Sequence, residues 1–119
     1  MVERLQIYMD TYKLSKLTYC ALKEMPKYDK HLIGARMITS ILDMFEWITL
    51  ANNQKSASER LRYLESFYTS FEQYKIQLRL CEELKFYKPT TVVNMQQLVN
   101  NISKQLNGWI KSTESRIQI

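Results

Sequence analysis

Apolar residues recur with the helical period through the last third of the chain. Their spacing of three or four residues, with two adjacent pairs, is typical of one helix face; they are Met95, Leu98, Val99, Ile102, Leu106, Trp109 and Ile110. Polar residues fill the opposite face: Asn100, Asn101, Lys104, Asn107 and Lys111. A helix that is apolar on one side buries that side, so this segment is expected to pack against the rest of the chain.

The same period predicts four helices. They run from about residue 3 to Glu24, from Asp29 to about Asn52, from Ser56 to about Phe86, and, after an interruption at Pro89, from Thr90 or Thr91 nearly to the C-terminus. Met25 precedes Pro26, which pushes it out of helical geometry. Three sites carry residues suited to helix N-caps: Asp29 for the second helix, Ser56 in a capping box with Glu59 for the third, and Thr90 or Thr91 for the fourth.

Few residues in this chain break helices, since only two of its 119 residues are glycine and two are proline. The connections are therefore short, and consecutive helices are expected to be antiparallel. The prediction is an all-α, up-down-up-down four-helix bundle forming a single domain over residues 1–119. Gly34 lies inside the second helix at a cost of about 1 kcal/mol relative to alanine. A close helix approach would account for it, or the glycine is tolerated without purpose.

Two helices carry apolar residues beyond one core stripe. Trp47 and Leu50 lie opposite the stripe of the second helix, where they are either covered by a neighbouring side chain or form a subunit contact. The third helix has a broad arc: Leu61, Tyr63, Leu64, Phe67, Tyr68, Phe71, Tyr74, Leu78 and Cys81. Lys75 falls inside this arc, as an ion-pair partner or a snorkelling side chain. We therefore expect a homo-oligomer, with an interface comprising Trp47, Leu50, Leu64, Tyr68 and Lys75.

The net charge of +5 favours an acidic partner. On the first helix, one side carries Ile7, Leu14, Leu17 and Ala21, and the other carries Tyr8, Tyr12, Lys16, Tyr19 and Lys23. Lysines among aromatic rings can bind phosphates and bases, although the rings can equally pack on a neighbouring helix while the lysines are solvated. Arg60, Arg62 and Arg79 have acidic residues nearby in the sequence, so they are not expected to be free charges. The candidate nucleic-acid-binding lysines are Lys16, Lys23, Lys27, Lys30, Lys85, Lys88, Lys104 and Lys111.

Enzyme chemistry finds little support. His31 is the only histidine, the two glycines are far apart, and no Glu-x-x-His metal motif occurs. We expect no catalytic site, metal or cofactor. Cys20 and Cys81 are expected to be buried free thiols in a reducing compartment. The first residues lack the apolar core of a signal peptide, and no apolar run approaches the roughly 20 residues of a membrane span. These features indicate a cytoplasmic protein without a membrane partner.

Five short motifs occur in an order and spacing that resemble one family of four-helix bundles. They are Met25-Pro26-Lys27, Gly34-Ala35-Arg36-Met37, Leu50-Ala51-Asn52, Leu78-Arg79-Leu80 and Leu106-Asn107-Gly108-Trp109-Ile110. The family includes proteins encoded in intervening sequences of bacterial large-subunit ribosomal RNA and the accessory variability determinant (Avd) of diversity-generating retroelements. The Gly-Trp-Ile motif near the C-terminus and the positive net charge resemble the Avd proteins more than the ribosomal-RNA group.

The resemblance implies a homopentameric barrel of bundles with a positively charged surface. Such a protein binds the element's reverse transcriptase and RNA or DNA, supports mutagenic cDNA synthesis, and has no catalytic site. By motif, Lys27, Arg36 and Arg79 match family positions for contacts with nucleic acid, transcriptase or a sibling subunit. The alternative is a structural or protein-binding bundle of the intervening-sequence type, without a transcriptase partner.

Overall fold

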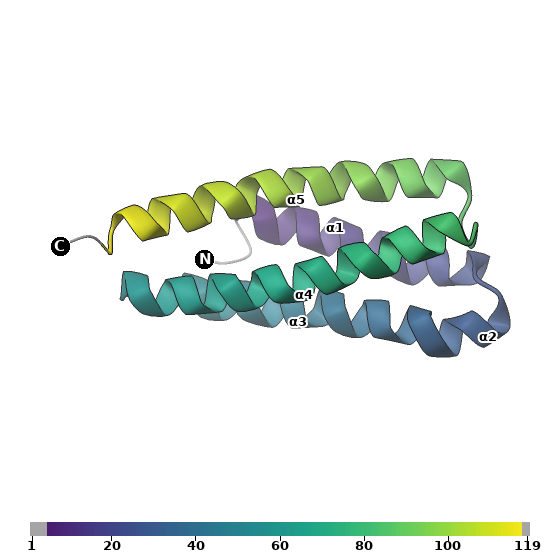
Figure 1. Ribbon diagram of the computed structural model, residues 1–119, viewed down its shortest axis with the longest axis horizontal. Coiled ribbons are helices and arrows are strands. Elements are labelled where there is room, and N and C mark those ends of the chain that lie inside the picture. The colour runs from purple at the N-terminus through teal and green to yellow at the C-terminus, as the bar shows by residue number, and fades with distance from the viewer. Residues whose placement is uncertain (1–4, 118–119) are drawn as a thin grey trace.

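The computed structural model describes residues 5–117 as four long antiparallel helices (Figure 1). They are α1 (Gln6–Ala21), α3 (Ala35–Asn52), α4 (Ala57–Glu83) and α5 (Pro89–Ser115). They form a ring in which α1 packs against α3 and α5, and α4 packs against the same two helices. The body measures 52 × 24 × 23 Å. The all-α, up-down-up-down bundle expected from the sequence is confirmed for these residues.

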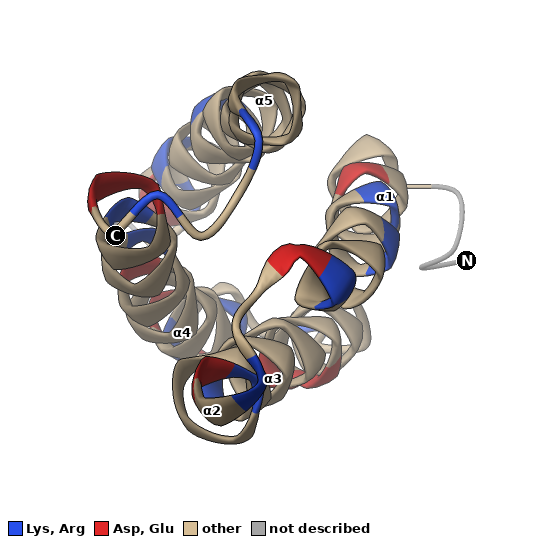
Figure 2. Ribbon diagram, turned by 90° about the vertical axis from the view of Figure 1, so that its right-hand side faces the viewer, with Lys and Arg blue, Asp and Glu red and all other residues tan. Residues whose placement is uncertain are grey.

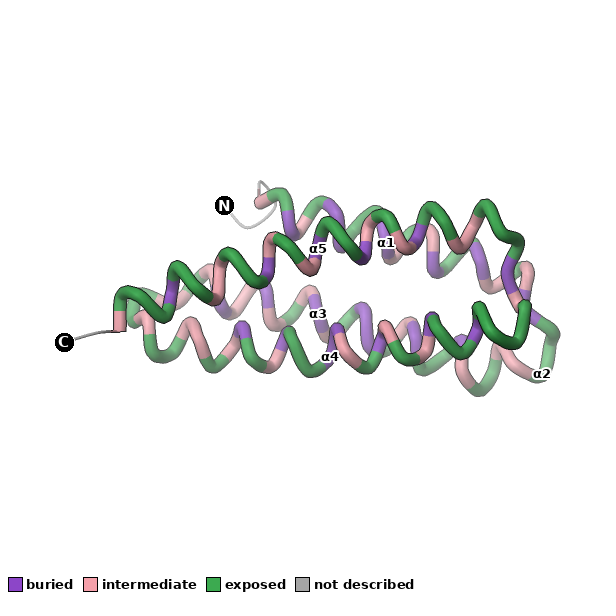
Figure 3. The backbone as a smooth tube through the Cα atoms, turned by 45° about the horizontal axis from the view of Figure 1, so that its top comes forward, coloured by how far each residue is buried: buried purple, intermediate pink, exposed green. Residues whose placement is uncertain are grey.

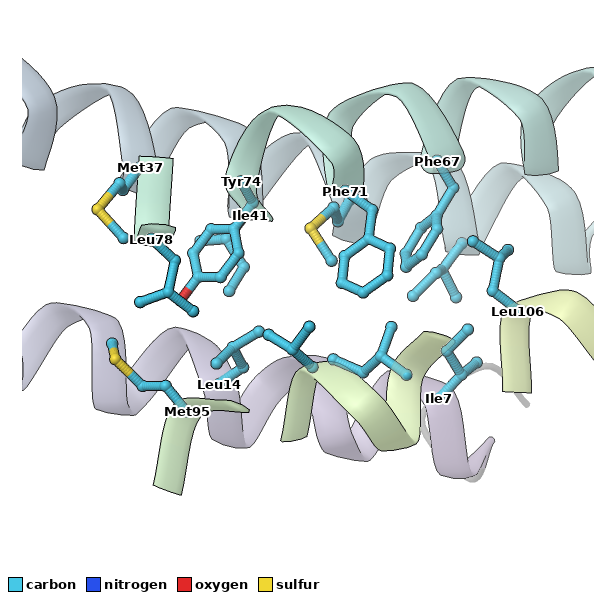
Figure 4. Packing of buried hydrophobic residues seen from close by; sticks show 14 of the residues in the cluster. Ile7, Leu14, Met37, Ile41, Phe67, Phe71, Tyr74, Leu78, Met95 and Leu106 are labelled. Atoms are coloured by element: carbon cyan, nitrogen blue, oxygen red, sulfur yellow. The ribbon is translucent and has the colours of Figure 1, made fainter. Parts of the chain in front are cut away.

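The hydrophobic core lies between the four helices and extends along the bundle. Phe67, Phe71 and Tyr74 of α4 point across the core toward α1 and α5, where Ile7, Leu14 and Met95 face them (Figure 4). Figure 3 shows buried positions on the inner side of each helix. The Tyr74 hydroxyl reaches across the core and forms a 2.6 Å hydrogen bond with the Thr18 hydroxyl. A buried hydroxyl with a partner avoids most of the cost of losing water.

The turn between α1 and α3 is itself helical. Leu22–Glu24 continue α1 as a 3₁₀ turn, and Met25 is extended (φ −80°, ψ 146°), as expected before proline. A short helix α2 (Lys27–Asp29) and a π-helical segment (Lys30–Gly34) then lead into α3. The prediction that Asp29 caps this helix is wrong. The helical segment already begins at Lys27, with Pro26 at the N-cap position, and Asp29 itself has helical angles (φ −75°, ψ −24°).

The helix α4 begins and ends by local signals. Its N-cap is Ser56, whose hydroxyl accepts the Glu59 N–H at 3.4 Å, so this predicted cap is confirmed. The helix ends at Glu83 and not at Phe86. Lys85 has a φ of 59°, a left-handed geometry that stops the helix, and the Phe86 N–H returns to the Cys81 carbonyl.

The N-terminus of α5 is held by a carboxylate from the 3₁₀ turn that follows α1. Glu24 accepts the Lys88 N–H through Oε1 at 2.7 Å and the Thr91 hydroxyl through Oε2 at 2.8 Å. The prediction that Thr90 or Thr91 caps this helix is therefore wrong, since Lys88 occupies the N-cap position without a side-chain bond. The positive end of the α5 helix dipole also stabilises a negative charge at this position.

The two glycines occupy different surroundings. A Cβ atom on Gly34 would lie 2.9 Å from Leu22 Cδ2 and 3.1 Å from Met25 Sδ, whereas one on Gly108 would meet nothing within 4 Å. The expected close approach at Gly34 is confirmed, and it involves the 3₁₀ turn after α1. Gly108 lies exposed inside α5.

The two cysteines also differ. Cys81 is buried as expected, and its thiol donates to Met37 Sδ at 3.6 Å. Burial raises the pKa of the Cys81 thiol. The expectation that Cys20 is buried is wrong, because this residue faces outward on α1.

Gly108→Ala is expected to stabilise the fold by about 0.5–1 kcal/mol, since alanine loses less backbone entropy in an exposed helix. Gly34→Ala is expected to lack this gain, because its new methyl group requires Leu22 and Met25 to move. Urea unfolding of both variants measures the difference. Equal stabilisation by the two substitutions would contradict the packing around Gly34.

One fast-reacting thiol per chain is expected with Ellman's reagent at neutral pH. Cys20 is exposed, whereas burial shields Cys81 and its raised pKa keeps the thiolate fraction low. The second thiol should react only after denaturant is added. Cys20→Ser should abolish the fast phase, and a fast phase that survives this substitution would contradict the burial of Cys81.

Candidate nucleic-acid interface

Exposed acids are scarce along α1 and α5. The only acid within Gln6–Ala21 is Asp10, which is 5% exposed and accepts hydrogen bonds from the side-chain amides of Gln6 and Gln105. The helix α5 contains one acid, Glu114, which is exposed in its last turn. Because α1 and α5 pack side by side, the lysines of both helices share one side of the bundle that is nearly free of negative charge.

The opposite side of the bundle carries more acids than bases. Most of the acids lie on α3 and α4: Asp43, Glu46, Glu59, Glu65, Glu72, Glu82 and Glu83. Arg79 Nε lies 3.3 Å from Glu83 Oε2, and Lys75 pairs with Glu72. Lys75 and Arg79 therefore have acids beside them, and the positive excess of the chain resides outside α3 and α4.

Five of the predicted lysines gather at one end of the bundle. Lys23, Lys27, Lys30, Lys85 and Lys88 lie in the segment between α1 and α3 and in the turn between α4 and α5. Figure 2 views the bundle from this end and shows blue basic segments there, with some red acidic ones. Lys30 is half-buried and the other four are exposed. Lys23, Lys85 and Lys88 line one surface hollow, whose acid, Glu24, is engaged at the start of α5.

The remaining predicted bases do not join this group. Lys16 is exposed on α1, and Lys104 and Lys111 are exposed on the outer face of α5. Arg36 is exposed on α3 and lines a groove between α3 and α4 with Leu32, Ile76 and Leu80. The structure thus places the lysines on the α1–α5 side and at one end, and it places Arg36 elsewhere.

The tyrosines of α1 divide between packing on a neighbouring helix and exposure to solvent. Tyr8 is half-buried and packs edge-on against Phe45 of α3, with ring centroids 5.1 Å apart. The centroid of the Tyr12 ring lies 6.3 Å from that of Phe45, yet Tyr12 is 53% exposed. Tyr19 is 68% exposed. Lys16 Nζ lies 5.7 Å from the Tyr12 ring centroid. Two rings among exposed lysines are therefore accessible to a ligand.

The residues proposed for an oligomer interface have varied surroundings. Leu64 is 0% exposed, so its assignment to an interface is wrong: it faces the core of its own subunit. Trp47 Nε1 donates to the Ser70 hydroxyl at 3.1 Å, and its ring stacks on Tyr63. Lys75 lies over the Phe71 ring and pairs with Glu72. Neighbouring side chains thus account for Trp47 and Lys75, whereas Leu50 is partly accessible and Tyr68 is 47% exposed.

A second apolar stripe on α4 was missed in the sequence. Ile76, Leu80 and Leu84 are 68%, 45% and 53% exposed, and their spacing of four residues places them on one face. That spacing was a readable signal.

Arg60 has a structural role that sequence reasoning did not identify. Its Nε donates to the Ala51 carbonyl at 3.1 Å, and its guanidinium also donates to the Gln54 carbonyl. These contacts satisfy backbone groups at the C-terminal end of α3, where helix carbonyls lack partners. Arg60 is therefore an unsuitable candidate for phosphate binding.

The described residues offer little for metal chemistry or membrane insertion. His31 is exposed in the π-helical segment, and residues 5–117 contain no group of three histidine, cysteine or acidic side chains placed to hold a metal ion. Of the helices described here, none combines the length and apolar character needed to cross a bilayer.

Comparison with known proteins identifies the family. A search of curated proteins found no match. A model of the bAvd-like family matches residues 2–113, which is nearly the whole chain, and agrees with the Avd-like resemblance of the five motifs. The chain therefore belongs to the bAvd-like family.

Proposed function

We propose that this chain is a non-catalytic accessory subunit of a diversity-generating retroelement that binds nucleic acid and the element's reverse transcriptase. The family membership supports the connection to such elements. The observation that carries the nucleic-acid part is the segregation of charge, since α1 and α5 expose lysines and almost no acid. In this proposal the protein acts in the cytoplasm and supports mutagenic cDNA synthesis by holding template or product beside the transcriptase.

The physical basis of binding is neutralisation of phosphates. Each lysine that meets a phosphate releases a condensed counterion, so affinity falls as salt rises. Lys104 and Lys111 are exposed seven residues apart on α5, about 10 Å along the helix axis. Lysines at one end of the bundle can extend this contact, with Lys23, Lys85 and Lys88 around one hollow.

A homo-oligomer, pentameric by the family resemblance, is part of the proposal. Its support within this chain is the exposed apolar stripe of Ile76, Leu80 and Leu84, beside which a groove runs between α3 and α4. Burying such a stripe against a sibling subunit removes apolar surface from water. This placement keeps the lysine-rich side of α1 and α5 free for nucleic acid.

RNA affinity measured by fluorescence anisotropy should fall steeply between 50 and 200 mM salt, conditions over which several phosphate contacts are lost. The double substitution Lys104→Gln and Lys111→Gln should reduce the slope of log affinity against log salt by roughly 1.5, at roughly 0.7–0.9 per contact. Lys55→Gln, in the turn between α3 and α4, is the matched control and should leave the slope unchanged. A flat salt response would favour a structural bundle of the intervening-sequence type.

Copurification tests the transcriptase part. A tagged reverse transcriptase from the same element should retain this protein at stoichiometric yield, with or without template RNA. The double lysine variant, compared in the absence of RNA, separates direct protein contact from tethering through nucleic acid. Failure to copurify under both conditions would refute the partnership.

Light scattering at tens of micromolar should give a mass well above the 14.3 kDa of one chain. Ile76→Glu should lower the mass toward the monomer, because a carboxylate on the exposed α4 stripe resists burial. Val93→Glu replaces an equally exposed apolar residue on α5 and should leave assembly intact. A monomeric wild-type protein would contradict the oligomer.

A further inference from the structure

One outward strip of α1 combines accessible rings with lysines. This α1 strip consists of Tyr12, Lys16, Tyr19, Cys20 and Lys23, all exposed. Tyr12 and Tyr19 are separated by seven residues, which is close to two helical turns. Their rings therefore point in similar directions, about 10 Å apart along the axis, with Lys16 between them.

Each ring borders an apolar hollow. Tyr19 and Cys20 line one with Ile38 and Leu42 of α3, and Leu42 is 57% exposed. Tyr12 lines a second with Tyr8 and Met9. Flat apolar surface beside each ring gives a planar ligand more area to cover than an isolated tyrosine on a helix would.

The charged side chains of the strip itself, Lys16 and Lys23, are both positive. Lys13 is exposed on the same helix, and Asp10, the one acid within Gln6–Ala21, is buried between two glutamines. The carboxylate next to Lys23, that of Glu24, accepts two hydrogen bonds at the start of α5. A ligand that fits this surface is anionic and presents several planar apolar faces.

Single-stranded nucleic acid has this combination, whereas a duplex hides its base faces within the stack. We propose that the α1 strip binds single-stranded nucleic acid, with bases stacked on Tyr12 and Tyr19 and phosphates held by Lys16 and Lys23. The proposal rests on the nucleic-acid binding proposed above and adds the strandedness and the location. In the free protein, Lys16 lies near the Tyr12 ring, and this exposed contact gives way when a base and its phosphate arrive.

The first test compares a short single-stranded RNA with a duplex of equal length at fixed salt. Tyr12→Ala and Tyr19→Ala should each weaken single-strand binding about fivefold or more, the effect of losing one stacked base. Neither should change duplex binding. Tyr12→Phe and Tyr19→Phe should bind as the wild type does, since the ring is retained. Tyr28→Ala removes an equally exposed tyrosine on α2 and should have less than a twofold effect. Circular dichroism melting checks that each variant is folded.

The second test locates the ligand through Cys20, which is exposed beside Tyr19. Saturating single-stranded RNA should slow the reaction of Cys20 with Ellman's reagent severalfold, and duplex should not. If Cys20 becomes protected at high protein concentration without RNA, a second copy of the chain covers the strip and the proposal is overturned.

The outcomes separate the two proposals. If the tyrosine variants bind single strands normally while the Lys104 and Lys111 substitutions weaken binding, the α1 strip is not the site, although nucleic-acid binding stands. If neither single strand nor duplex binds at low salt, both proposals fail.

Discussion

Burial of one apolar face by each of four helices is the constraint on which the rest of this structure depends. A helix with such an apolar face is not stable alone in water, and the face of each helix is buried only when the bundle is assembled. Phe71 and Tyr74 of α4 illustrate this, because their contacts extend to α1 and α5 on the far side of the core. The inner faces therefore have similar chemistry, and the outer faces are free to differ.

The outer faces do differ, and they divide the molecule into two sides. On α3 and α4, acids accompany the bases, and an apolar stripe runs through Ile76 and Leu80. On α1 and α5, exposed lysines outnumber the single exposed acid, Glu114, and two tyrosine rings remain accessible. A single helix cannot offer both surfaces at once without mixing their charges. The bundle separates them by placing the two kinds of helix on opposite sides of one core.

The sequence predicted what depends on local spacing. The period of three to four residues identified the helices, Pro26 marked the end of α1, and Ser56 marked the start of α4. Features that depend on distant residues were beyond it. The cap of α5 comes from Glu24, 64 positions before Lys88, and no local pattern indicates that. The period also does not say which apolar residue of a broad arc faces inward, so Leu64 was assigned to the surface. Cys20, next to the buried Ala21, was misplaced for the same reason.

The carboxylate of Glu24 also has a consequence for recognition. By joining the end of α1 to the start of α5, it fixes two turns that would otherwise move independently. Lys23 and Lys88 are therefore held at a set separation before any ligand arrives. A polyanion that binds this end meets a preorganised pair of charges, and less conformational entropy is lost than if two loops had to be ordered.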